Sequence, residues 1–181
     1  MRLPAAIPFL VCAAVSVAAD EFKPEPGFAL LFNGKNFDGW QTQTGQKESL
    51  DGKAEAFGGR FVAKGGELVI DPAVKGDVLI ETKRQFGGRV TIRFEFKPDA
   101  KCNNDLFLLG TKFDIKKEDI KNLKQDEWNE LEIVAKDGKV AFTCNGQIVR
   151  SIATKGDKST FAIRAEFGTM TIRKLRASDG K

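Results

Sequence analysis

The chain contains no histidine and no tyrosine among its 181 residues. The lack of histidine excludes a Ser-His-Asp triad, a Cys-His catalytic pair and any zinc site with histidine ligands. The three cysteines are too few for a tetrathiolate metal site. Because tyrosine is also absent, any proton transfer would have to use carboxylates, lysines or thiols.

The chain also lacks a basic tract and a second long apolar run. Lysines, arginines and carboxylates alternate along it, whereas a nucleic-acid partner needs clustered positive charge. The one apolar run, "LPAAIPFLVCAAVSVA", follows Met1-Arg2 and ends in small residues, which is typical of a secretory signal peptide. Its length and its prolines make a retained membrane anchor the weaker interpretation. We expect an exported protein, periplasmic or secreted, with no transmembrane span in the mature chain and no nucleic-acid partner.

These features predict one domain behind a leader. We expect a signal peptide at 1–19, a linker at 20–26, a single domain at 27–177 and a short tail at 178–181. Cys102 and Cys144 remain after processing. An exported compartment permits a disulfide between them, and two buried free thiols are the alternative.

Alternation of apolar and polar residues dominates the rest of the chain. In "RVTIRFEFK" (89–97) every second residue is apolar, and 130–136 and 161–167 repeat this pattern. Asn145-Gly146 suits a type I′ hairpin turn. Only 116–128 is a candidate for a short surface helix, with a turn as the alternative. The predicted fold class is all-β, an antiparallel β-sandwich or jelly roll with at most one short helix and a phenylalanine-rich core.

One segment, "GFALLFNGKNFDGW" (27–40), resembles the start of the 3-keto-disaccharide hydrolase domain, a family of bacterial proteins with a concanavalin-like jelly-roll fold. Members usually begin G-F-x-x-L-F-[ND]-G-K-x-[LF]-x-G-W. Later segments of the chain also resemble segments of the family, in the same order, so the resemblance covers most of residues 25–177. These segments are "GGELVIDP", "GDVLIETKRQFGGRVTIRFEFK", "DEWNELEIVAKDGKVAFTCNGQIV" and "MTIRKLRA".

This resemblance implies a carbohydrate partner and cleavage of glycosides whose ring carries a ketone at carbon 3. The ketone acidifies the C2 hydrogen, so a base can remove it, the C1 substituent is expelled and water adds back. Such a site needs a base and either a divalent metal ion or a cationic side chain to stabilise the enolate. In a jelly roll it would lie on the concave sheet, lined by the outward-facing polar residues.

The resemblance places three candidate catalytic residues in this region. Asp114 is the candidate base or metal ligand, with a solvent-facing strand end as the alternative. Lys112, two residues earlier, would stabilise an enolate or simply pair with Asp114. Glu166 is the third candidate.

Four further residues are candidates for substrate binding. Arg164 and Glu166 form either a pair that binds sugar hydroxyls or an ordinary surface ion pair. Asn104 and Asp105 would reach a sugar hydroxyl or a hard cation such as Ca²⁺, unless "DAKCNNDL" is only a turn. Trp40 would stack on a sugar or anchor the core.

Three classes of function therefore remain open from the sequence. The first is an enzyme that cleaves 3-keto-glycosides. The second is a carbohydrate-binding module that kept the sandwich without the acid-base residues, because the chain has no histidine where many family members carry one. The third is an envelope scaffold that binds protein.

Overall fold

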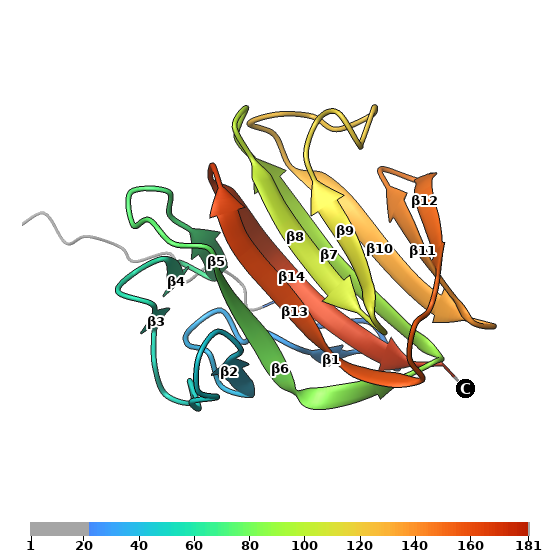
Figure 1. The fold of residues 1–181 in the computed structure, drawn as a ribbon, viewed down its shortest axis with the longest axis horizontal. Coiled ribbons are helices and arrows are strands. Elements are labelled where there is room, and N and C mark those ends of the chain that lie inside the picture. Colours follow the sequence, from blue (N-terminus) through green and yellow to red (C-terminus); the bar gives the residue numbers. More distant parts are fainter. Residues whose placement is uncertain (1–21, 181) are drawn as a thin grey trace, which may run out of the picture.

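The computed structural model describes residues 22–180, which form two antiparallel β-sheets and no helix. Figure 1 shows the sheets as stacked layers, with β8, β9 and β13 in front of β7, β10 and β14. The predicted all-β sandwich is confirmed. Among these residues no helix is long and apolar enough to cross a membrane. The expected signal peptide at 1–19 lies outside the described residues.

The larger sheet has nine strands, which pair in an order far from their order in sequence. From one edge to the other they are β12 (Gln147–Ala153), β11 (Lys139–Cys144), β10 (Asn129–Lys136), β7 (Val90–Pro98), β14 (Met170–Asp179), β5 (Glu67–Ile70), β4 (Phe61–Lys64) and β3 (Glu55–Ala56), and β1 (Ala29–Leu30) also pairs with β14. The last strand continues to Asp179, two residues beyond the expected end of the domain at 177.

The smaller sheet has five strands and carries the polar face discussed below. In spatial order they are β2 (Trp40–Thr42), β6 (Val78–Gly87), β13 (Lys158–Phe167), β8 (Asn103–Leu108) and β9 (Thr111–Ile115). Its central strand, β13, comes late in the sequence and separates β6 from β8. The neighbours of each strand are therefore set by tertiary pairing and not by chain order.

The core lies between the two sheets and is built from the alternating apolar residues. Val90, Ile92, Phe94 and Phe96 of β7 are all buried, while the residues between them are partly exposed. The ring of Phe113 in the smaller sheet stacks on Phe142 in the larger one, with centroids 4.2 Å apart. Each buried phenylalanine side chain stabilises the fold by about 1.5–3 kcal/mol, so the sequence alternation accounts for the packing.

The conformation of each turn agrees with the residue types that form it. Asn145 and Gly146 both have positive φ, 48° and 78°, as a type I′ hairpin turn requires. In contrast, 116–128 forms turns and no helix, so the turn alternative is correct. Its two apolar residues, Ile120 and Leu123, are both buried. A helix of this length is only marginally stable in water by itself. Two buried apolar residues provide too little packing to stabilise it.

Candidate functional site

The outer face of the five-stranded sheet presents two rows of side chains that run across the strands. Their inward neighbours Ile80, Ile163, Leu106 and Phe113 pair in register and are buried. Directly opposed residues project from the same face, so the residues in between form the outer rows. One row is Gln41, Glu81, Ala162, Phe107 and Lys112; the other is Leu79, Arg164, Asp105 and Asp114.

Five charged residues meet on this face, and we call them the charged cluster: Asp105, Lys112, Asp114, Arg164 and Glu166. The Asp105 side chain is fully buried; it is in contact with Arg164 Nη2, and its Oδ2 lies 3.4 Å from Lys112 Nζ. Lys112 Nζ lies 2.7 Å from Asp114 Oδ1, and Arg164 Nη2 lies 2.8 Å from Glu166 Oε2. Asp114 and Glu166 keep 20% and 22% of their side chains exposed, so a ligand can reach both.

The two aspartates of the cluster have opposite pKa shifts. Burial, together with the hydrogen bond that protonated Asp105 donates to Asp114, raises the pKa of Asp105 to about 6 in spite of the nearby Arg164 and Lys112. Burial also acts to raise the pKa of Asp114, but its hydrogen bonds with Lys112 and Asp105 outweigh burial and lower the pKa. At mildly acidic pH the pair therefore holds one proton, on the buried Asp105, beside an ionised and accessible Asp114.

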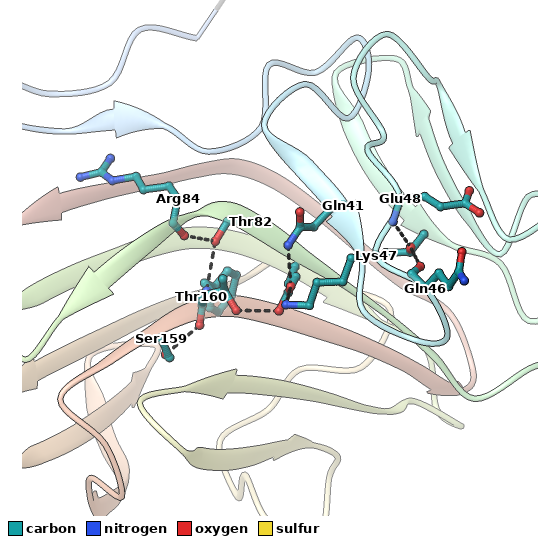
Figure 2. Close-up of polar contacts among 11 residues, drawn as sticks. Gln41, Gln46, Lys47, Glu48, Thr82, Arg84, Ser159 and Thr160 are labelled. Carbon is teal, nitrogen blue, oxygen red and sulfur yellow. Dashed lines mark hydrogen bonds and ion pairs between the residues drawn. The ribbon is translucent and has the colours of Figure 1, made fainter.

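A second polar group on the same face surrounds Glu81, which is 1% exposed. Its carboxylate accepts hydrogen bonds from Gln41 Nε2 at 2.7 Å, Lys47 Nζ at 2.5 Å and Thr160 Oγ1 at 2.8 Å. Figure 2 shows Gln41, Lys47 and Thr160 converging from three different segments. Burial acts to raise the pKa of Glu81, but these donors outweigh it and lower the pKa.

The sequence pattern predicts only that Glu81 lies on a strand and does not reveal its polar partners. Its donors come from β2, from the loop after β2 and from β13, so only the strand order reveals the group. A glutamate among the apolar residues of "DVLIETK" is the only local signal, and it does not identify a partner.

The structure places two candidate substrate-binding residues in the interior, and for Trp40 this agrees with the core-anchor alternative. Trp40 is fully buried, packs near Phe161 and donates a hydrogen bond from Nε1 to the Leu31 carbonyl at 2.6 Å, so it anchors the core and cannot stack on a sugar. Asn104 points inward and is also fully buried, because β8 alternates and Asp105 takes the outer face. Its Oδ1 accepts the Glu166 backbone N–H, so Asn104 positions Glu166 instead of touching a ligand.

The two cysteines do not form a disulfide. Cys102 and Cys144 are both free and buried, as the second alternative from the sequence stated. Cys102 Sγ is hydrogen-bonded to the Ile115 carbonyl and the Asn104 amide. Burial raises the pKa of Cys102 to about 12 and that of Cys144 to about 11, so neither thiol is a nucleophile at neutral pH.

The charged cluster does not fit a divalent metal ion. Its carboxylates are already bridged by Lys112 and Arg164, and within residues 22–180 no group of three or more Asp, Glu, His or Cys side chains is placed to bind a metal. Hard cations need several oxygen ligands around one point. Within the charged cluster, the positive charge available to a ligand is therefore that of Lys112 and Arg164.

Known structures share this fold at low sequence identity. A proposed glycosyl hydrolase from Parabacteroides distasonis ATCC 8503 is 15% identical, with a TM-score of 0.70 over 90% of this chain and 100% of that one. The carbohydrate-binding module CBM66 from Bacillus subtilis is 12% identical, with a TM-score of 0.55 over 78% of this chain and 96% of that one. No protein of curated function matches the sequence.

A family model provides the closer assignment. The model of the 3-keto-alpha-glucoside-1,2-lyase-like domain matches residues 27–121, slightly more than half of the chain. The matched segment runs from the opening motif through β9, and so includes Glu81, Asp105, Lys112 and Asp114. The resemblance read from the sequence is confirmed: the chain belongs to the 3-keto-alpha-glucoside-1,2-lyase-like domain family.

Proposed function

We propose that this protein cleaves 3-keto-glycosides on the outer face of its five-stranded sheet. The observation that supports this most is the Asp105–Asp114 pair flanked by Lys112 and Arg164, on an accessible face of the family domain. A base and a cationic side chain are the two requirements of proton abstraction next to a ketone. We also propose that the chain is exported, because residues 1–19 have the pattern of a signal peptide.

The proposed reaction assigns a role to each accessible member of the cluster. Asp114 accepts the C2 proton, and Lys112, whose Nζ lies 2.7 Å from it, stabilises the negative charge that develops on the C3 oxygen. The C1–O bond then breaks to give an enone, and the proton held by the carboxyl pair passes to the departing oxygen. Water adds at C1 and a proton returns to C2, so the net result is hydrolysis. Arg164 and Glu166 hold hydroxyl groups of the sugar.

A non-catalytic carbohydrate-binding module is the second candidate. The lowered pKa of Asp114 favours it, because a carboxylate with a low pKa is a weak base. The ion pairs of the cluster would then form a fixed set of donors and acceptors for sugar hydroxyls. This alternative predicts glycan binding without turnover.

A hollow on the opposite face of the sandwich is a less suitable location. It has a volume of about 310 Å³ and is lined by residues that include Arg93, Glu95, Glu132 and Arg176. Arg93 pairs with Glu132 and with Glu25, which also binds Arg176, so the charges of the hollow are paired like those of the charged cluster and do not favour either face. Most of its lining comes from β10, β11 and β14, outside the family match.

The decisive experiment is incubation with a 3-keto-glucoside, with and without a chelator, followed by detection of the released sugar. We expect turnover by the wild-type protein that the chelator does not abolish, and a loss of at least about 100-fold in Asp114→Asn. Glu132→Gln is the matched control, since Glu132 is also ion-paired on an outer sheet face, with Arg93 at 2.6 Å. It should retain full activity.

Each other outcome has a distinct meaning. Unchanged turnover in Asp114→Asn would overturn the assignment of the base. A loss in Glu132→Gln instead would move the site to the opposite hollow. Glycan binding without any turnover would favour the binding module.

A further inference from the structure

Two arginines lie directly opposite each other on the outer face of the nine-stranded sheet. Arg176 of β14 pairs in register with Arg93 of β7, and like charges in this position repel each other. A β-bulge in β14 creates the pair, because without its extra residue Leu175 would lie opposite Arg93. Lys174 in the bulge has a φ of 56°, which is unfavourable for a residue other than glycine. The strand therefore carries local strain at the point that brings the two arginines together.

The carboxylate of Glu25 bridges this arginine pair. It accepts a hydrogen bond from Arg176 Nε at 2.7 Å and one from Arg93 Nη1 at 3.0 Å. The hydrogen bond from Arg176, supported by the one from Arg93, outweighs partial burial and lowers the pKa of Glu25 to about 2. Hydrogen bonds between guanidinium groups and a carboxylate are among the stronger ones in proteins. The two arginines therefore already form a binding site for a carboxylate group.

The segment that carries this carboxylate, residues 22–28, contains no buried residue, and we call it the strap. Its rings lie on the same two arginines: the centroid of Phe22 is 5.3 Å from Arg176 Cζ, and that of Phe28 is 4.9 Å from Arg93 Cζ. Partly exposed ion pairs and cation–π contacts each add little to stability. A segment without buried apolar contacts detaches more readily than the sheet unfolds, so the strap is a cover that a ligand can displace.

The arginine pair also borders the hollow of about 310 Å³ on this face, beside Thr143 and Gly146. A ligand that binds the pair through a carboxylate therefore has space for the rest of its structure. Gly27 has a φ of 87° and lies just before β1, which pairs with β14. Because glycine rotates freely between backbone conformations, rotation at Gly27 frees Glu25 from the arginines while β1 stays in the sheet.

We propose that Arg93 and Arg176 form a carboxylate-binding site, which Glu25 occupies in this structure and which a carboxylate-bearing ligand occupies when it displaces the strap. Glu25 is then a built-in competitor, so the apparent affinity for an external carboxylate is reduced to the fraction of molecules with a detached strap. The group bound here is a carboxylate, and this defines the ligand class. The site lies on the opposite sheet from the charged cluster and does not depend on the proposed reaction.

The test is an NMR titration of the full chain with sodium acetate at constant ionic strength, which follows the side-chain Nε–H signals of Arg93 and Arg176. Glu25→Gln removes the internal competitor and should bind acetate at least about tenfold more tightly than the wild type. Asp179→Asn is the matched control, because Asp179 forms an exposed ion pair with one arginine, Arg84, at 2.6 Å. Its acetate affinity at Arg93 and Arg176 should equal that of the wild type.

Further measurements separate the site from the strap. Arg176→Met in the Glu25→Gln background should abolish acetate binding, and saturating acetate should shift the amide signals of Phe22 and Phe28 in the wild type. Equal acetate affinity in the wild type and Glu25→Gln would overturn the competition by the strap, and binding that survives Arg176→Met would overturn the site. Loss of the folded spectrum in Glu25→Gln would show that the strap cannot detach and would overturn the proposal. Tighter binding of phosphate than of acetate would overturn the carboxylate assignment.

Discussion

At the scale of single residues, the feature best suited to acid-base chemistry is the unequal environment of two neighbouring aspartates. Asp105 and Asp114 are directly opposite on β8 and β9, yet the side chain of Asp105 is fully buried and that of Asp114 is 20% exposed. Burial penalises the charged form of Asp105, whereas Lys112 stabilises the charged form of Asp114. Adjacent carboxyl groups with separated pKa values can divide the tasks of holding and accepting a proton.

The raised pKa of Asp105 leads to a prediction about stability. Its pKa rises from 3.8 to about 6 on folding, so between these values the folded state binds more protons than the unfolded state. The contribution of Asp105 to the free energy of unfolding therefore decreases as pH rises through this window. Relative to Asp105→Asn, which has no such titration, the wild type should lose up to about 3 kcal/mol from pH 4 to pH 6.

Urea unfolding of both proteins at intervals between pH 4 and pH 7 measures this difference. The stability gap should change within the window and stay constant from pH 7 upward. If the two stability curves run parallel across the whole range, Asp105 titrates normally and the carboxyl pair does not share a proton.

At the scale of elements, the hairpin turns show how local chemistry and tertiary contacts combine. Asp137-Gly138 and Asn145-Gly146 are both tight turns whose residues have positive φ. Only Asn145 also connects other segments: its Oδ1 accepts the Glu130 N–H, and its Nδ2 donates to the Asn122 carbonyl and to Asn129 Oδ1. The turn therefore fastens the segment before β10 to the β11–β12 hairpin.

We predict that Asn145→Ala is more destabilising than Asp137→Ala by about 2–3 kcal/mol. Both changes place alanine at a positive φ, so the strain is equal, and the difference reports the three side-chain hydrogen bonds of Asn145, each contributing about 0.5–1.5 kcal/mol. Asp137 makes no side-chain hydrogen bond within residues 22–180, which makes it a suitable control. Thermal or urea unfolding measures the stability of both variants. Equal losses of stability would mean that the hydrogen bonds of Asn145 make no net contribution to the free energy of unfolding.

At the scale of the whole molecule, Arg60 connects the two sheets. It precedes β4 of the nine-stranded sheet, is 2% exposed, and donates from Nη1 to the Asp71 carbonyl at 2.7 Å. Its Nη2 donates to the Glu166 carbonyl in the five-stranded sheet at 2.8 Å. A guanidinium group has enough donors in a fixed plane to reach both carbonyls, and this contact holds the strand end that carries Glu166 and Phe167.

Replacing Arg60 should weaken the whole fold. Arg60→Met leaves two carbonyl groups without their charged donor and should lower the free energy of unfolding by about 2–4 kcal/mol. Arg84→Ala is the control, because Arg84 makes an exposed ion pair with Asp179 at 2.6 Å; exposed pairs contribute about 0–1 kcal/mol. Urea denaturation compares the two variants, and similar small losses in both would show that Arg60 does not connect the sheets energetically.

The sequence alone determined the layers, most strands and the family of this protein. Alternation over 89–97 predicted which residues of β7 are buried, and glycine and asparagine pairs predicted the hairpin turns. The opening motif predicted the family through residues 27–40. These properties follow from interactions between residues close in sequence, such as side-chain alternation and positive φ in turns, which a single chain displays directly.

Only the tertiary structure decided which polar residues meet. Asp105 and Arg164 are adjacent because β13 pairs between β6 and β8. Glu81 acquires donors from three distant segments because β6 lies between β2 and β13. Trp40 and Asn104 were candidates by residue type, but the register turns both inward. A shift of one residue in strand pairing exchanges the two faces of a strand, so the composition of the polar face depends on register and strand order, which sequence patterns do not specify.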